Sequence, residues 1–305
     1  MDLRARLQSI APVTGRQFAA FRIALGLYLA AHCAALLPWG RELFSRAGAL
    51  ANPRLNPIDG LLPNVLARWD SPGTVTIFLT VLTVLALLFA VGFQRRAVAL
   101  VLWYGWACLF NRNVLIGNAS LPYVGLLLLL TAVVPEREPW RMTYRRAAHR
   151  DGAVFQMPAA VWFAAWVLMA TGYAFNAGVM VFSPSWLDGT ALWHILHGPF
   201  ARTGWMRTLA VALPAALLEW ATWEVLALQL LFLPLALWRL TRPVAWLTMC
   251  GVQLALLGLV SATDLSIGML LLHGFTFDPR WLALLRRHAR KATIADEGRA
   301  PAIAA

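Results

Sequence analysis

The chain has 305 residues, of which 60% are hydrophobic and 13% charged, and its formal net charge is +12. A mean hydropathy of +0.64 is typical of a multi-span helical membrane protein and excludes an ordinary soluble domain. The positive charge is nearly all arginine, placed in short stretches between apolar runs. That placement favours membrane topology signals over a nucleic-acid-binding face, so no nucleic-acid partner is expected.

Eight apolar segments follow one another, and each approaches the roughly 20 residues that a helix needs to cross a bilayer. They are Gln17–Leu37, Thr74–Phe93, Ala97–Leu115, Leu121–Val134, Ala159–Phe182, Ala215–Leu237, Val244–Val260 and Leu265–Leu285. A helix is predicted for each, because a spanning segment must satisfy its own backbone hydrogen bonds. We predict an all-α, polytopic membrane bundle of about eight transmembrane helices over residues 1–285. A basic cytoplasmic tail over residues 286–305 is expected to be disordered.

Arginine is concentrated in alternate connections between these segments. Basic clusters precede the first segment, separate the second from the third, the fourth from the fifth and the sixth from the seventh, and follow the eighth. Under the positive-inside rule these connections are cytoplasmic, together with both termini. The remaining connections, which carry polar and aromatic residues of mixed character, are assigned to the outer face.

A few ionisable residues fall inside apolar segments, where a charge costs roughly 2.5–3.5 kcal/mol at the helix centre. Arg22 lies about one turn into the first segment, where it either extends to the cytoplasmic interface or has a buried acidic partner. Glu219 and Glu224 are separated by about 140° on a helix, so they do not form a carboxylate pair. His32 and His273 have no partner visible in the sequence, and packing roles are expected for both.

The outer connection after the fifth segment, residues 183–214, breaks an apolar pattern with Pro184 and a cluster of polar and aromatic residues. His194 and His197 share a helix face but have no third ligand at a useful spacing, so no metal site is predicted. Together with the end of the third segment, this connection is predicted to bind a ligand or partner. The residues are Asn111, Arg112, Asn113, Trp186, Asp188, His194 and His197. Alternatively, the stretch from Pro184 to Gly189 is only a helix entry, with Asp188 or Ser185 as the cap.

Four sets of short motifs occur in a recognisable order. They are Phe21-Arg22-Ile23 with Gly26-Leu27, Leu43-Phe44-Ser45 with Ala47-Gly48-Ala49-Leu50, Asn111-Arg112-Asn113 with Gly117-Asn118, and Ala177-Gly178-Val179 followed by residues 184–192. In order and spacing the chain resembles the HTTM family, the membrane domain shared with vitamin K-dependent gamma-carboxylase, over roughly Gln17–Leu285. The resemblance implies a helical bundle in the bacterial inner membrane, with its working side on the periplasmic face.

The chain departs from the carboxylases at the residue on which their chemistry depends. There, a lysine just after the Ala-Gly pair deprotonates vitamin K hydroquinone, and Met180 or Val181 is similar in position here. The single lysine is Lys291, in the predicted tail, and an arginine would stay protonated. Gln229 and Gln253 likewise stand where relatives tend to carry glutamate and histidine. Gamma-glutamyl carboxylase activity is therefore not expected.

The sequence favours a non-carboxylating member of this family that binds a lipid, a quinone or a peptide partner at its periplasmic face. Analogy with bacterial relatives suggests a role in the maturation or export of a secreted peptide. No cofactor is evident, although a quinone is compatible with the resemblance. The alternative is a membrane enzyme acting on a quinone or lipid, with Glu224, Glu219 or His194 as the proton-transfer group. A transporter is a third interpretation, but no inverted repeat is visible.

Overall fold

The computed structural model describes residues 12–52, 55–56, 60, 63–117, 120–141, 155–261 and 263–282. Within these ranges the named elements are helices, and Ala201 and Val260 form an isolated bridge outside them. The predicted tail over residues 286–305 lies outside the described residues, and so does Asn118. The prediction of an all-α fold is confirmed for the part of the chain that is described.

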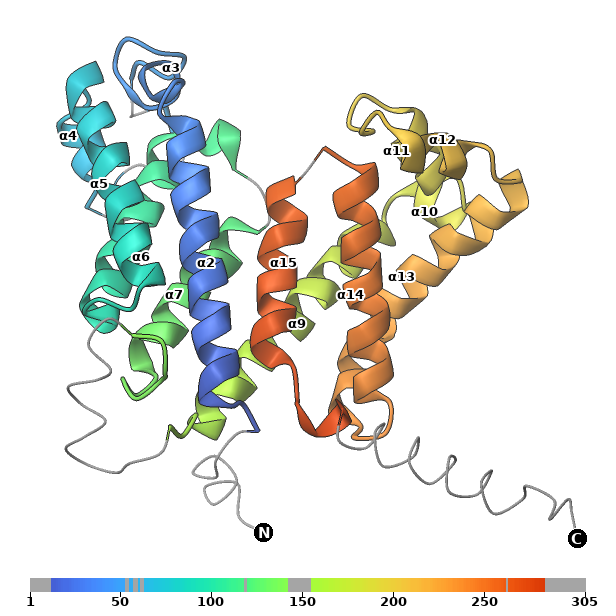
Figure 1. The fold of residues 1–305 in the computed structure, drawn as a ribbon. Helices are drawn as coiled ribbons and strands as arrows, with labels where there is room; N and C mark the ends of the chain where they lie inside the picture. The colour runs from blue at the N-terminus through green and yellow to red at the C-terminus, as the bar shows by residue number, and fades with distance from the viewer. Residues whose placement is uncertain are drawn as a thin grey trace, which may run out of the picture.

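Each of the eight predicted segments contains one long helix. These are α2 (Gly15–Leu36), α5 (Pro72–Ala90), α6 (Arg95–Arg112), α7 (Leu121–Val133), α9 (Ala159–Met180), α13 (Ala215–Leu237), α14 (Arg242–Leu259) and α15 (Thr263–Thr276). The connections hold the short helices α3 (Gly40–Phe44), α4 (Val65–Arg68), η2 (Val114–Ile116), α10 (Pro184–Leu187), α11 (Ala191–His197) and α12 (Trp205–Val211). We call the end that carries α3, α4 and α10 to α12 the upper end, after its place in Figure 1, and the opposite end the lower end.

Five of the long helices, α2, α5, α9, α13 and α14, are long and apolar enough to cross a membrane. Helix α6 has arginines at both ends. Helices α7 and α15 have 13 and 14 residues, which makes them about 20 Å long and shorter than the roughly 30 Å hydrocarbon core. By length and composition the chain is therefore a multi-pass membrane protein, and the number of eight crossings stays a prediction.

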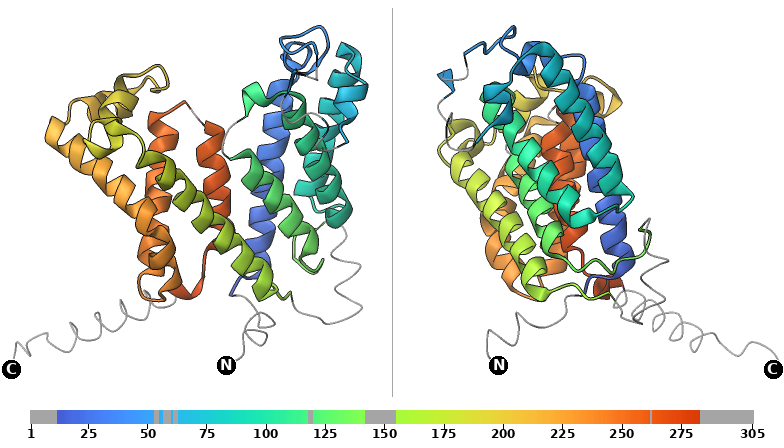
Figure 2. Two further views of the ribbon diagram at one scale, coloured as in Figure 1. Left: turned by 180° about the vertical axis from the view of Figure 1, so that it is seen from behind. Right: turned by 90° about the vertical axis from the view of Figure 1, so that its left-hand side faces the viewer.

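The long helices form two lobes joined by α15 (Figures 1 and 2). The first lobe consists of α2, α5, α6 and α7, and the second of α9, α13 and α14. Helix α15 contacts α2 and α7 on one side and α9 and α14 on the other. Helix α13 leans away from the centre toward the upper end, where α10 and α11 pack on it.

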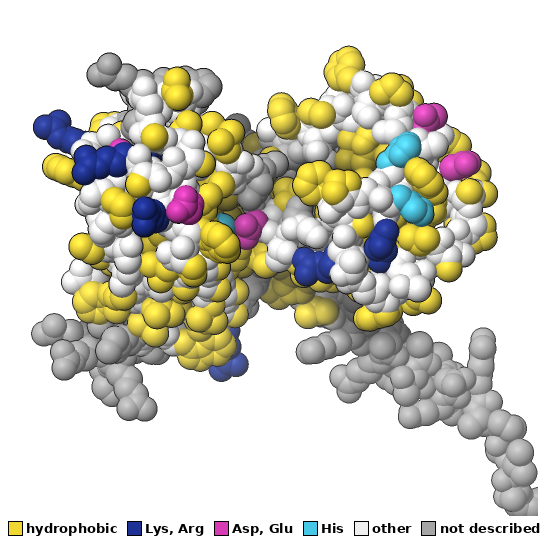
Figure 3. Space-filling view, turned by 90° about the horizontal axis from the view of Figure 1, so that it is seen from above, with side chains coloured by type: hydrophobic (Ala, Val, Ile, Leu, Met, Phe, Trp, Pro, Cys, Tyr) yellow, Lys and Arg dark blue, Asp and Glu magenta, His cyan; other side chains and the backbone are white. Residues whose placement is uncertain are grey.

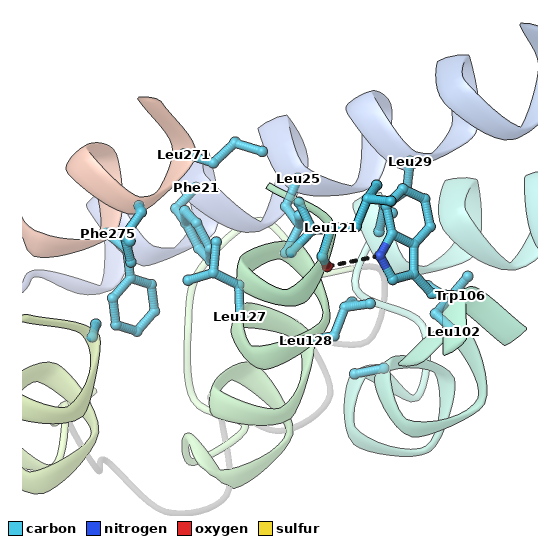
Figure 4. Close-up of a cluster of buried hydrophobic side chains, with 14 of the residues drawn as sticks. Phe21, Leu25, Leu29, Leu102, Trp106, Leu121, Leu127, Leu128, Leu271 and Phe275 are labelled. Carbon is cyan, nitrogen blue, oxygen red and sulfur yellow. Dashed lines mark hydrogen bonds between the residues drawn. The ribbon is translucent and has the colours of Figure 1, made fainter. Parts of the chain in front are cut away.

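The apolar core of the first lobe lies where α2, α6, α7 and α15 meet (Figure 4). The rings of Phe21 and Phe275 meet edge to face, with centroids 4.8 Å apart. The indole of Trp106 donates a hydrogen bond of 3.0 Å to the carbonyl of Leu121, which joins α6 to the first turn of α7. This packing places the first and last described helices side by side.

Three buried charged side chains lie at the lower end of the first lobe. The side chains of Arg22, Arg95 and Glu138 are all fully buried. Glu138 Oε1 lies 3.0 Å from Nε of Arg95 and 3.6 Å from Nε of Arg22. These contacts are ion pairs that lack hydrogen-bond geometry. Of the two alternatives for Arg22, the buried acidic partner is confirmed.

The same two arginines cap two helices. Arg22 donates hydrogen bonds to the carbonyls of Phe89, at 2.9 Å, and Ala90 in the last turn of α5. Arg95 donates to two carbonyls at the end of α7. The last carbonyls of a helix have no partner within it, and a cation is favoured at that end. Arg95, which belongs to a basic connection, and Arg22, which lies inside the first segment, therefore both join helices of the bundle.

Candidate functional site

The predicted residues Asn111, Arg112 and Asn113 are buried at the upper end of α6. Asn113 Nδ2 donates a 2.8 Å hydrogen bond to the carbonyl of Leu43, and Arg112 Nη1 donates one of 2.8 Å to Leu50. The carbonyl of Asn111 accepts a bond from a side chain of the same connection. Their contacts are therefore with the protein's own first connection, which they fix against α6.

Asp188 lies at the turn between α10 and α11. Its carboxylate accepts hydrogen bonds from the amide and the hydroxyl of Thr190, at 2.9 and 2.6 Å. These bonds lower the pKa of Asp188 below its ordinary value. The indole of Trp223 donates to the carbonyl of Leu187 at 3.1 Å and fixes the turn on α13. Asp188 thus fixes the turn before α11, but the N-cap of that helix is Thr190 without a side-chain capping bond, so neither Asp188 nor Ser185 is the cap of the alternative interpretation.

His194 and His197 are exposed on α11. The ring of His197 stacks on Trp193, with centroids 4.3 Å apart. Trp186, in the preceding helix α10, is half-buried. Figure 3 shows histidine side chains on the upper surface of the lobe that carries α10 to α12. Within the described ranges, no three His, Cys, Asp or Glu side chains are placed to hold a metal ion.

The structure separates the two predicted groups of site residues. Asn111 to Asn113 end α6 in the first lobe, whereas Trp186 to His197 lie over α13 in the second (Figure 1). Glu224 is exposed on α13, and Glu219 is half-buried. The alternative enzyme requires a buried carboxylate or histidine, and neither Glu224 nor His194 is buried.

A third polar group lies at the upper end, where α2 meets α15. His32 Nδ1 and the hydroxyl of Tyr28 each lie 3.2 Å from Asp264 Oδ1. The side chains of His32 and Asp264 are 12% and 37% exposed, so the pair reaches the upper surface. The expectation that His32 only packs is wrong, because Asp264 is its partner.

The surroundings of His32 are aromatic. Its ring centroid lies 4.9 Å from that of Trp106 and 6.4 Å from that of Phe110. The contact with Asp264 favours the tautomer with a proton on Nδ1, which leaves Nε2 as an acceptor. Nε2 is buried and has no hydrogen-bond partner among the described residues. A buried acceptor without a partner is costly, so this atom is suited to receive a ligand's hydroxyl proton.

Arg202, in the connection between α9 and α13, lies against the start of α15. The amide of Arg202 donates to the carbonyl of Leu259 at 2.8 Å, and Nη2 donates to the hydroxyl of Thr263 at 2.6 Å. Thr263 directly precedes Asp264. The connection that the sequence marks as functional therefore reaches the site through Arg202, which is not among its predicted binding residues.

The second lobe contains a neutral polar cluster. Asn176 Nδ2 donates to Gln229 Oε1 at 2.6 Å and lies 3.7 Å from the sulfur of Met180. Gln253 Nε2 lies 3.3 Å from the hydroxyl of Tyr173. Met180 and Gln229, two positions that the resemblance associates with carboxylase chemistry, thus meet at Asn176, but with a thioether and an amide. This cluster can bind through hydrogen bonds and offers no strong base.

Comparison of the chain with known protein families, with curated proteins and with solved structures found no match. The resemblance to the HTTM family therefore stays a prediction from sequence motifs. The His32–Asp264 pair is the candidate functional site.

Proposed function

We propose that the protein is a multi-pass inner-membrane member of the HTTM family that binds a quinol at its periplasmic face, without carboxylase activity. The observation that carries the proposal is His32 Nε2, a buried acceptor with no partner in the described part of the chain. The other ring nitrogen lies 3.2 Å from Asp264 Oδ1. The contact with the carboxylate fixes the ring so that Nε2 can accept a hydrogen bond from a ligand hydroxyl.

A quinol carries both a hydroxyl donor for Nε2 and an apolar ring for the aromatic surroundings. A phenolic hydroxyl donates its proton to Nε2, and the aromatic ring packs against Trp106 and Phe110. If the proton is transferred, it moves to Nε2 and leaves a quinolate, with no electron transfer required. The first and last helices adjoin the site, so an isoprenoid tail can leave between helices into the bilayer.

Carboxylation is not part of the proposal. Met180 and Val181 stand where the carboxylases have their basic lysine, and the chain's single lysine is Lys291. The amide cluster around Gln229 does not supply a replacement base. Purified protein given vitamin K hydroquinone and labelled bicarbonate should therefore produce no carboxylated peptide.

A second candidate function is the binding of a secreted peptide at α10 to α12. Three large aromatic residues of this region are exposed, namely Trp193 at 46%, Phe200 at 70% and Trp205 at 72%. Exposed aromatic clusters are common at binding surfaces. Alanine at Phe200 and Trp205 should weaken peptide binding and leave quinol binding unchanged.

The test is calorimetric titration of the protein in nanodiscs with a short-chain benzoquinol. We expect His32→Phe and Asp264→Asn to weaken binding at least about tenfold, since each removes or misorients a charge-assisted hydrogen bond. His197→Phe, an exposed histidine on α11, is the matched control and should bind as the wild type does. Equal binding by wild type and His32→Phe would overturn the proposal.

A further inference from the structure

A shallow groove runs between α9 and α13 toward the lower end of the second lobe. It encloses about 60 Å³, far below the roughly 300–1,000 Å³ of pockets that bury soluble ligands. Its apolar walls are exposed, with Phe163 50%, Val167 47% and Leu233 44% accessible. On helices long and apolar enough to cross a membrane, such a face meets the hydrocarbon core. The groove therefore suits an acyl chain lying along it.

One guanidinium is fixed at the lower end of this groove. Arg242 at the start of α14 lies over the ring of Trp166, 5.4 Å from its centroid. Arg242 Nε donates to the carbonyl of Ala236 at 2.6 Å, and Nη2 lies 3.4 Å from the carbonyl of Leu237. These contacts orient the group against the end of α13. Nη1 has no acceptor among the described residues, so it can donate to a ligand.

The charge around Arg242 is positive. Arg239, Arg280 and Asp278 are close enough to interact with it electrostatically. Asp278 attracts Arg242 but is also paired with Arg280 at 2.7 Å, so the single carboxylate does not balance the positive charge of this group. An anion is therefore favoured here over a neutral or zwitterionic group.

Two indole donors line the same groove. Trp162 and Trp166 face each other edge on, with ring centroids 5.9 Å apart. Trp166 is 6% exposed. Neither Nε1–H has an acceptor within the described ranges, whereas a buried tryptophan usually finds one. The groove thus combines one cation, two unpaired donors and an apolar wall.

We infer that this groove binds an anionic glycerophospholipid of the leaflet at the lower end. Phosphate oxygens accept hydrogen bonds from Arg242, ester or glycerol oxygens accept from the indoles of Trp162 and Trp166, and an acyl chain lies against Phe163 and Val167. The lower end carries the basic connections, and anionic lipid is attracted to such a surface. The site lies at the opposite end from His32 and does not depend on the proposed quinol binding.

The test is native mass spectrometry of delipidated protein offered phosphatidylglycerol and phosphatidylcholine in equal amounts. We expect preferential retention of phosphatidylglycerol, and about tenfold weaker retention in Arg242→Gln, because a charge-assisted bond is lost. Arg239→Gln removes the same charge from an exposed neighbour and should stay within about twofold of the wild type. Trp166→Phe keeps an aromatic ring but removes the donor, so it should weaken retention several-fold.

Three outcomes would overturn the inference. Equal losses in Arg242→Gln and Arg239→Gln would mean that general surface charge attracts the lipid. Equal retention of the two lipids would remove the requirement for an anion. Displacement of phosphatidylglycerol by excess glycerol phosphate would identify a soluble phosphate site instead. Should Arg242→Gln fail to fold, Trp166→Phe decides, and unchanged retention in that variant contradicts the site.

Discussion

The substitution Glu138→Gln should strongly destabilise the lower end of the first lobe. Glu138 is the acid that lies against both Arg22 and Arg95, and all three side chains are fully buried. The variant keeps the shape of the side chain but leaves two guanidinium groups without a counter-charge between them. The perturbation therefore tests whether the buried ion cluster holds the helix ends together.

The expected magnitude follows from the geometry. At an effective dielectric constant of about 20, charges 3.0 and 3.6 Å apart attract by roughly 5 kcal/mol per pair. Desolvation of Glu138 offsets part of this attraction, and breaking a buried pair typically costs about 3–5 kcal/mol. The hydrogen bonds of Arg22 and Arg95 to helix-end carbonyls survive in the variant. We therefore expect a loss near the lower limit, about 3 kcal/mol.

The assay is equilibrium unfolding of the purified protein in mixed micelles, followed by the helical circular dichroism signal. Glu136→Gln is the matched control, because Glu136 pairs with Arg141 at 3.0 Å but its side chain is 31% exposed. This control variant should lose less than about 1 kcal/mol of unfolding free energy. The double variant Arg95→Gln/Glu138→Gln should lose less unfolding free energy than the two single variants lose together. Equal losses for Glu138→Gln and Glu136→Gln, or strict additivity in the double variant, would refute the reasoning.

Three further predictions concern a glycine, a pH dependence and the topology. Gly92→Ala should lower the free energy of unfolding by about 1–3 kcal/mol, because Gly92 has φ +75° and an added Cβ would lie 3.0 Å from a guanidinium. Thermal melting is the measurement, and the control Gly73→Ala should change it little, because an added Cβ there meets open space. Since hydrogen bonds lower the pKa of Asp188 from its ordinary value of 3.8, the ionised group stabilises its turn above that value. This contribution is lost as the pH falls through the lowered pKa, so tryptophan fluorescence should show a transition below pH 3.8 that Asp188→Asn lacks. Reporter fusions at Arg145 and Phe200 should report opposite sides of the membrane, and a shared side would contradict the eight-span topology.

Helix positions could be predicted closely because the apolar runs end at polar, charged, glycine or proline residues. The largest error lies in the last helix, predicted to reach Leu285, whereas α15 ends at Thr276. Asp278 precedes Pro279, and a residue before proline is disfavoured in the helical conformation. Helix α6, the third predicted segment, also ends early, at Arg112. Asn113 is extended there, and its side-chain oxygen accepts a hydrogen bond from the amide of Leu115.

The site could not be predicted to the same degree because its partners are distant in the chain. His32 and Asp264 lie near the upper ends of the first and last helices, 232 residues apart. The sequence marks each as polar but contains no local signal that α2 and α15 are neighbours. The same holds for Arg22 of α2, whose partner Glu138 lies after α7. Periodicity predicts helices, whereas contacts between helices depend on packing of the whole bundle.

The hydrogen bond proposed at His32 Nε2 can be observed directly by nitrogen NMR of protein labelled with ¹⁵N-histidine. We predict that a benzoquinol shifts the Nε2 signal of one histidine, and that this signal is absent from His32→Phe. The shift should be reduced in Asp264→Asn, because the carboxylate sets the tautomer. Histidine signals that stay unchanged on addition of the quinol, or a shift that persists in His32→Phe, would contradict quinol binding at this site.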